Sequence, residues 1–120
     1  MQGDFMQFIY YPKCSTCIKA KKKLEELKIE ADLRDIKENN PNKEELISFY
    51  KKSNLPLKKF FNTSGLLYKE MKLKDKLPTM SEDEMLTLLS ENGMLVKRPL
   101  LIGDDFILVG YKEQEYEKLV

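Results

Sequence analysis

Two cysteines three positions apart, Cys14 and Cys17, stand where the sequence changes from a strand pattern to a helix pattern. The aromatic and β-branched run at residues 5–11 precedes them and predicts a buried strand. A helix is predicted from Ser15 to about residue 28, because apolar side chains recur there on one helical face. The residues of that face are Cys17, Ala20, Leu24 and Leu27. The chain is therefore constrained to place both thiols at the first turn of a helix that follows a strand.

A thiol at that place has a specific chemistry. The first turn of a helix carries unpaired N–H groups and the positive end of the helix dipole, and both stabilise a thiolate. Such surroundings lower the pKa of a cysteine from about 8.5 to roughly 3.5–7.5. Cys14 is therefore the predicted nucleophile, and Cys17, one turn further along, is the predicted resolving thiol of a Cys-x-x-Cys redox pair.

Three other interpretations explain the pair less well. A structural zinc site needs two more ligands and prefers Cys and His, but the chain has no histidine and no third cysteine. A structural disulfide would close a very small loop and constrain the unfolded chain little. Two unrelated buried thiols remain an alternative. We expect neither a metal nor an organic cofactor.

Composition limits the class of protein. The 120 residues predict one domain, 1–120, with a formal net charge of +1 that gives no general basic field for direct binding of nucleic acid. No apolar run approaches the roughly 20 residues of a membrane span, and residues 1–4 lack the features of a signal peptide. We expect a cytoplasmic protein without a membrane partner, in a compartment where a cycling dithiol is favoured over a permanent disulfide.

Four lysines lie close together in the first predicted helix. They are either a solvated helix face or a positive rim that supports the Cys14 thiolate. The lysines concerned are Lys19, Lys21, Lys22 and Lys23.

The rest of the chain predicts an α/β fold. Residues 31–36 form a second strand, parallel to the first, and this completes a βαβ unit. A helical block follows: a helix to about residue 52 with Asn42 and Glu45 as a capping box, a short helix at 57–61, a helix at 66–73, and a helix at 81–91 that begins with another capping box. In the first of these helices, the residues expected to be buried are Leu46, Ile47 and either Phe49 or Tyr50.

The last part of the chain returns to a strand pattern. Residues 100–102 and 106–109 predict a β-hairpin, with 106–109 as an edge strand, and residues 111–119 predict a final helix. The order βαβ, helical insertion, ββα is a thioredoxin-like fold with a four-stranded mixed sheet. In such folds the proline at the position of Pro99 is cis and lies against the active-site cysteine, whereas the sequence alone also allows a trans proline that opens a strand.

Four segments resemble the ArsC/Spx family of arsenate reductase-like, glutaredoxin-like proteins. They are Tyr-Pro-Lys-Cys-Ser-Thr-Cys at 11–17, Phe-Phe-Asn-Thr-Ser-Gly at 60–65, the run at 93–100 that ends in Arg98-Pro99-Leu100, and Val-Gly-Tyr at 109–111. The resemblance covers nearly the whole chain and is greatest for small ArsC-like proteins of low-GC Gram-positive bacteria.

The resemblance implies roles for particular residues. It implies a nucleophilic Cys14, a cis Pro99 and an anion-binding Arg98 beside the thiolate, with Lys13 and Asn62 as structural residues of the site. A guanidinium both stabilises a thiolate and binds an oxyanion with two N–H groups. From the sequence alone, the alternative interpretation of Arg98 is a surface arginine beside a turn.

The chain also departs from its relatives in that family. Glutaredoxin-linked arsenate reductases use one catalytic cysteine and three arginines. Arg98 matches one arginine, but the second falls on Asn62 and the third on Gly110, while Arg34 lies in the second predicted strand. Spx-type regulators share the Cys-x-x-Cys pair, the Arg-Pro pair and the glycine, bind RNA polymerase, and have a C-terminal extension that would begin near Val120.

The sequence therefore predicts a cytosolic thiol–disulfide oxidoreductase that uses Cys14 and Cys17 and is reset by glutathione, glutaredoxin or a thioredoxin-type reductant. The alternatives are a redox-sensing regulator of the Spx type, with RNA polymerase as its partner, and an arsenate reductase proper.

Overall fold

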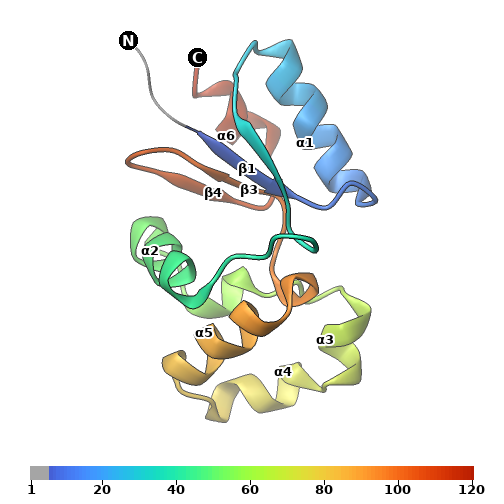
Figure 1. Cartoon of the computed structure of the whole chain (residues 1–120), viewed down its shortest axis with the longest axis vertical. Helices are drawn as coiled ribbons and strands as arrows, with labels where there is room; N and C mark the ends of the chain where they lie inside the picture. The colour runs from blue at the N-terminus through green and yellow to red at the C-terminus, as the bar shows by residue number, and fades with distance from the viewer. Residues whose placement is uncertain (1–5) are drawn as a thin grey trace.

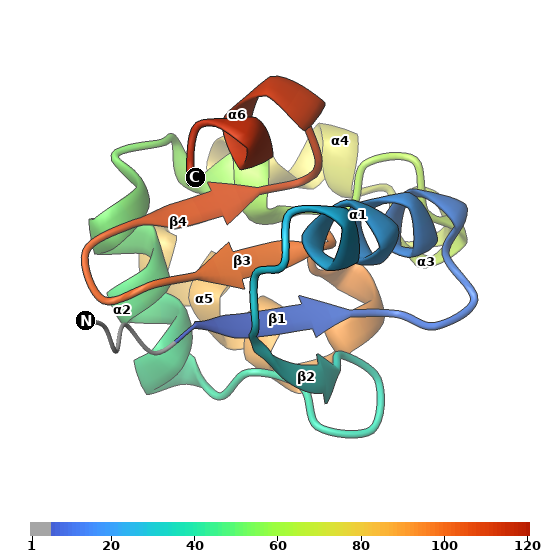
Figure 2. The same cartoon turned by 90° about the horizontal axis from the view of Figure 1, so that it is seen from above.

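The computed structural model describes residues 6–120, and its centre is a mixed four-stranded sheet in the order β2-β1-β3-β4 (Figures 1 and 2). The strands are β1 (Gln7–Tyr10), β2 (Asp32–Asp35), β3 (Leu100–Ile102) and β4 (Ile107–Val109). β1 pairs in parallel with β2 and antiparallel with β3, and β3 pairs antiparallel with β4. The predicted βαβ unit, the hairpin and the edge position of β4 are confirmed. The predicted start of the first strand, Phe5, lies outside the described residues.

The two faces of the sheet are covered by different helices (Figure 2). One face packs against α1 (Ser15–Glu26) and α6 (Glu113–Glu117). The other packs against the helical insertion, chiefly α2 (Lys43–Ser53) and α5 (Glu82–Glu91). Alternation along the strands explains this division, because successive side chains of a strand point to opposite faces. Phe8 and Leu101 belong to the α1/α6 core, and Ile9 and Leu100 to the insertion core.

The helical insertion follows its local sequence signals closely at two helix starts. Asn42 accepts a hydrogen bond from the backbone of Glu45, and the Glu45 side chain accepts one from the backbone of Asn42. Ser81 and Glu84 form the same reciprocal pair at the start of α5. Each pair satisfies N–H groups that a helix start leaves without partners. Both predicted capping boxes are confirmed.

Three predicted helices differ from the observed ones. The predicted helix 66–73 is wrong as a continuous element: it is α3 (Leu66–Glu70), then α4 (Leu73–Lys76), separated at Lys72, whose φ is 54°. This left-handed residue redirects the chain so that Leu73 enters the core, where it is 1% exposed. The first helix ends at Glu26 rather than 28, and α6 is shorter than 111–119. In α2, Leu46 and Phe49 are buried, but Ile47 is only partly buried.

Three short 3₁₀ segments occur in the insertion, two between its helices and one between α5 and β3. They are η1 (Leu57–Phe60), η2 (Leu77–Thr79) and η3 (Gly93–Leu95). Phe61 forms an isolated antiparallel bridge with Val96, and the N–H of Lys97 donates to the carbonyl of Phe60 at 2.7 Å. The segment that leads into Arg98 is therefore held on the insertion. Within residues 6–120, the helices all fall short of the length and apolar content needed to cross a membrane.

Candidate active site

The site begins where β1 ends and the chain turns into α1 (Figure 2). The N–H of Cys14 donates to the carbonyl of Tyr11 at 3.0 Å, which closes a turn through Pro12 and Lys13. Cys14 is then the N-cap of α1, with extended backbone, and its carbonyl accepts the first helical bond from Ile18. The first turn of α1 contains no acidic residue. No carboxylate of this first turn therefore opposes a negative charge on Cys14.

Cys14 is the more acidic of the two thiols. It is only partly buried, and this burial opposes its ionisation. Hydrogen bonds from the Cys17 backbone, the Cys17 thiol, Arg98 and the Thr16 backbone outweigh the burial, so the pKa of Cys14 lies below its usual value. The two backbone donors belong to the open first turn of the helix, which agrees with the predicted cause.

Cys17 lies in the opposite environment. Its side chain is 0% exposed, on the face of α1 that packs on the sheet. Burial raises the pKa of Cys17 to about 12, and the neighbouring Cys14 adds to that rise, while a hydrogen bond from the Tyr11 N–H opposes it. At neutral pH, therefore, Cys14 is the thiol available for attack and Cys17 is the protonated thiol beneath it.

Arg98 connects the cysteine turn to the start of β3. Its guanidinium carbon lies 5.2 Å from the centroid of the Tyr11 ring, a cation–π contact, and Nη1 donates to the carbonyl of Met94 at 3.3 Å. Nε is buried and has no hydrogen-bond partner within the described part of the chain. Together with its effect on the pKa of Cys14, this arrangement places a partly unsatisfied cation beside the thiolate.

The other predicted site residues, Pro99, Lys13 and Asn62, make no hydrogen bond to Cys14 within the described part of the chain. The Arg98–Pro99 peptide bond is cis, and the carbonyl of Pro99 accepts a hydrogen bond from Gly110 at 2.8 Å. Lys13 is exposed, and Asn62 is partly buried beside Ser64 and Gly65. Among residues 6–120, no hydrogen bond or ion pair joins either Lys13 or Asn62 to Cys14.

The remaining arginine is used elsewhere. Arg34, on β2, forms a two-point ion pair with Glu45, with nitrogen–oxygen distances of 2.7 and 2.9 Å. It also donates to Gln7 and to the carbonyls of Asn39 and Asn40. Arg34 therefore joins the sheet to the capping box of α2 and is not part of the cysteine site.

The lysines of α1 contact α6 or solvent and not the thiols. Lys23 lies 3.0 Å from Glu117 and 3.2 Å from Glu113, so it joins α1 to α6. Lys19 and Lys22 are exposed. No lysine is among the groups that shift the pKa of Cys14. The solvated-face interpretation therefore fits the cluster better than a rim around the thiolate.

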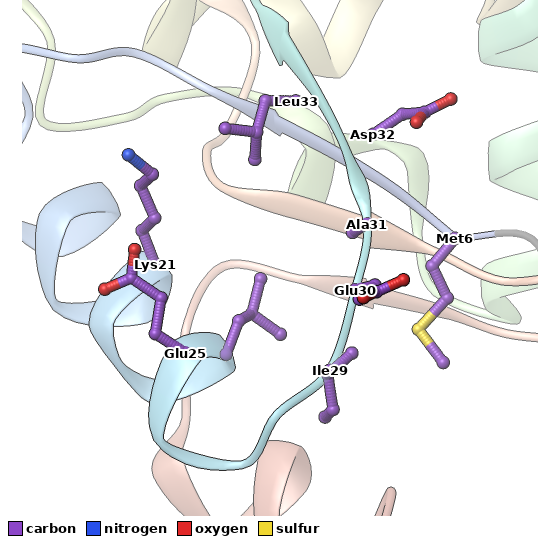
Figure 3. Close-up of a pocket in the computed structure, with 9 residues that line it drawn as sticks. Met6, Lys21, Glu25, Ile29, Glu30, Ala31, Asp32 and Leu33 are labelled. Carbon is purple, nitrogen blue, oxygen red and sulfur yellow. The ribbon is translucent and has the colours of Figure 1, made fainter.

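A pocket of about 550 Å³ lies on a different part of the surface, between α1 and the edge strand β2 (Figure 3). Lys21 and Glu25 line it from the helix, and residues 29–33 line it from the opposite side. The pocket contains neither cysteine nor Arg98. No group of three or more His, Cys, Asp or Glu side chains that could hold a metal occurs in the described residues.

Tyr11 belongs to the site, and Tyr116 packs on the buried face of α1, although neither residue was predicted to have a role. Tyr11 contributes its N–H to Cys17 and its ring to Arg98. Tyr116, on α6, is 0% exposed; burial raises the pKa of Tyr116, and Cys17 adds to that rise. Tyr11 lies within segment 11–17, which resembles the family, so the sequence contained a signal for its part in the site. Nothing in the sequence connects Tyr116 with Cys17, because 99 positions separate them.

Comparison with known proteins agrees with this geometry. The model of the ArsC family matches residues 9–119. The uncharacterized protein YusI of Bacillus subtilis is 54% identical over 113 residues, which cover 94% of this chain and 96% of YusI. The global transcriptional regulator Spx 2 of Bacillus cereus is 24% identical over 107 residues, covering 89% of this chain and 80% of the regulator.

A solved structure extends the likeness to the fold. The crystal structure of an ArsC family related protein from Bacteroides fragilis has a TM-score of 0.94 and 56% identity, and the match covers 96% of this chain and 97% of that one. The expected resemblance and the thioredoxin-like α/β fold are both confirmed. The chain belongs to the ArsC family.

Proposed function

We propose that this protein is a thiol–disulfide oxidoreductase of the bacterial cytoplasm. The observation that carries the proposal is the separation of the two thiols in acidity and exposure. Cys14 is accessible and has a lowered pKa, whereas Cys17, one helical turn away, is buried and has a pKa of about 12. A two-step exchange requires one thiol that ionises and attacks the substrate. It also requires a second thiol that stays protonated until it resolves the mixed disulfide.

In the proposed reaction, the Cys14 thiolate attacks a substrate disulfide and forms a mixed disulfide. Arg98 stabilises the thiolate before attack by its positive charge. Cys17 then displaces the substrate thiol and leaves the Cys14–Cys17 disulfide. A cellular dithiol or thiol reductant of the thioredoxin, glutaredoxin or glutathione type returns the pair to the reduced state.

A second candidate is a redox-sensing regulator of the Spx type, with RNA polymerase as the partner. Two observations favour it: the likeness to Spx 2 of Bacillus cereus and the glycine at position 110, which that kind of protein shares. Arsenate reduction is the third candidate. It is weakened by Asn62 and Gly110 in place of two anion-binding arginines and by the structural use of Arg34.

Trapping of partners separates the first two candidates. Cys17→Ser protein is incubated with cell extract, washed, and eluted with dithiothreitol, with the Cys14→Ser, Cys17→Ser double variant as the matched control. For an oxidoreductase, the single variant retains many thiol proteins as mixed disulfides, because the resolving step is missing. A single dominant partner held without a covalent link, such as RNA polymerase, supports the regulator instead.

A turnover assay tests the enzyme directly. Purified protein is supplied with several reductants and with either model disulfides or arsenate. Saturable disulfide turnover that is lost in Cys14→Ser supports the oxidoreductase. Thiols that stay reduced under strong oxidant would contradict both redox candidates.

A further inference from the structure

We propose that the free edge of β2 and the pocket beside it bind an extended segment of a partner protein in which basic and apolar side chains alternate. The segment would add a fifth strand to the sheet at its β2 end. This surface contains neither cysteine nor Arg98, and the inference does not depend on the proposed redox function.

The strand β2 has an unused hydrogen-bonding side. It is the end strand of the sheet, and β1 is its strand partner within residues 6–120 (Figure 2). The N–H groups of Asp32 and Ile36 donate to the carbonyls of Met6 and Tyr10, at 2.9 and 2.8 Å. Backbone groups of alternate strand residues point to the same side, so the N–H and carbonyl of Leu33 point away from β1. An antiparallel strand residue placed opposite Leu33 would exchange both hydrogen bonds with it.

An apolar side chain marks this edge. Leu33 is 52% exposed, although many edge strands are protected by lysine or proline. Leu33 is in register with Phe8, so its side chain lies on the sheet face that α1 covers. Figure 3 shows it pointing into the space between β2 and α1, where the pocket continues over Leu24 and Ile29. An apolar side chain of an added strand can therefore enter this pocket beside Leu33.

The charged groups around the pocket are mostly acidic. Glu25, Glu30 and Asp32 line it, against the single cation Lys21. None of these three carboxylates takes part in an ion pair within the described part of the chain. In Figure 3 the side chains of Glu30 and Asp32 point away from α1, on the opposite side of β2 from Leu33. Basic side chains on that face of an added strand would lie beside them, and opposite charges across neighbouring strands are stabilising.

The same charges favour a different protein over a second copy of this chain. A second copy would bring its own Glu30 and Asp32 to the edge, and like charges on paired strands are destabilising. Arg34 is the cation of β2, but Glu45 already binds it at 2.7 and 2.9 Å. A segment that alternates basic and apolar side chains matches both faces of the edge without this conflict.

The test uses a fluorescein-labelled peptide in which lysine and valine alternate, with binding measured by fluorescence anisotropy. One control peptide has the same composition with the lysines and valines in separate blocks, and a second has glutamate in place of lysine. We expect the alternating peptide to bind about tenfold or more tightly than either control. Hydrogen exchange of the Leu33 amide should slow when this peptide is present, because the amide then donates to the added strand.

Substitution of Leu33 tests the edge itself. Leu33→Lys should weaken binding of the alternating peptide by about tenfold or more, because an apolar contact is lost and a like charge is added. Leu66→Lys is the matched control, since Leu66 is an equally accessible leucine, 74% exposed, on α3. Circular dichroism checks that both variants are folded.

The acidic groups are tested by a charge-neutral pair. Glu30→Gln combined with Asp32→Asn should weaken binding and make it less dependent on salt concentration. Glu70→Gln combined with Asp75→Asn removes the same charge from exposed positions of α3 and α4 and should change neither property.

Three results would overturn the inference. The first is equal affinity of Leu33→Lys and Leu66→Lys, or unchanged exchange of the Leu33 amide on peptide binding. The second is loss of binding in Cys14→Ser, which would place the peptide at the cysteine site. The third is a dimer of the unsubstituted protein in analytical ultracentrifugation that Leu33→Lys abolishes, which would identify a second copy as the occupant. Failure of the redox assays alone would leave the β2 surface unaffected.

Discussion

The backbone N–H of Tyr11 donates to Sγ of Cys17 across 3.5 Å, so the residue that follows β1 contacts the buried thiol directly. The ring of the same tyrosine lies under the guanidinium of Arg98, at 5.2 Å. One residue thus contacts both the resolving thiol and the cation beside the nucleophile. This connection relates the thiol pair of α1 to the segment before β3, although the two are far apart in the sequence.

The first prediction concerns the order in which the thiols react. Iodoacetamide at neutral pH should modify Cys14 well before Cys17, because Cys14 is accessible and has the lowered pKa. Burial and a pKa of about 12 protect Cys17. Peptide mass spectrometry of samples quenched over time measures the order. Faster labelling of Cys17 would reverse the assigned roles.

The second prediction tests the contribution of Arg98. Arg98→Gln removes the positive charge beside Cys14, so the pKa of Cys14 should rise. The alkylation rate near neutral pH should then fall, and its pH profile should move upward. Lys97→Gln is the matched control, since it removes the neighbouring positive charge from the same segment. Equal profiles for the two variants would remove Arg98 from the thiol site.

The third prediction concerns the ion pair of Arg34 and Glu45. Arg34→Ala should lower the free energy of unfolding by about 1–3 kcal/mol, because several charge-assisted hydrogen bonds are lost. Denaturant titration measures the change. The alkylation rate of Cys14 should not change, since Arg34 is no part of the thiol site. A stable variant with altered thiol reactivity would contradict this division of roles.

The same ion pair gives the stability a pH dependence. Arg34 holds the pKa of the Glu45 carboxyl below its usual value. A lowered folded-state pKa stabilises the fold above the unfolded-state value of about 4.3, and this stabilisation is lost as the pH falls through the lower folded-state value. Arg34→Ala should therefore show a smaller loss of stability on acidification than the unsubstituted protein.

The fourth prediction concerns Gly93, which leads into the segment before Arg98. A Cβ at this position would overlap the carbonyl oxygen of Ile36, a backbone atom that cannot move aside alone. Gly93→Ala should cost about 1–3 kcal/mol of stability, the range for overpacking. Gly65→Ala is the matched control, because its new methyl group meets the end of the Asn62 side chain, which can rotate away. Thermal unfolding of both variants should show the larger loss for Gly93→Ala.

The fifth prediction is weak binding of arsenate. Arg98 is the one arginine beside Cys14, since Asn62 and Gly110 occupy the other two positions. Each lost charge-assisted contact costs about 1.5–3 kcal/mol, so affinity should be lower by several orders of magnitude than with three arginines. Turnover at micromolar arsenate measures this, and efficient turnover would contradict the prediction. Gly110 has a φ of 79°, so an arginine introduced there would be strained, and Asn62→Arg is the better variant for restoring affinity.

Several features of the molecule follow from local sequence. The capping boxes at Asn42 and Ser81 form as predicted because they need only residues three positions apart. The βαβ order and the hairpin follow from the hydrophobic periods and the turn residues. The place of Cys14 at the start of α1 follows from the change of period after β1. The break at Lys72 was not predictable in this way, because the burial of Leu73 in the insertion core decides it.

The sequence by itself determined the thiol pair, its helix and the order of the elements, because each of these depends on neighbouring residues. The tertiary structure alone decided what surrounds the thiols. It paired Arg34 with Glu45 and, among residues 6–120, left Nε of Arg98 without a hydrogen-bond partner beside Cys14. It also brought Tyr116 of the last helix to the core face of α1. Those choices depend on contacts between segments far apart in the chain, and no local period or spacing encodes them.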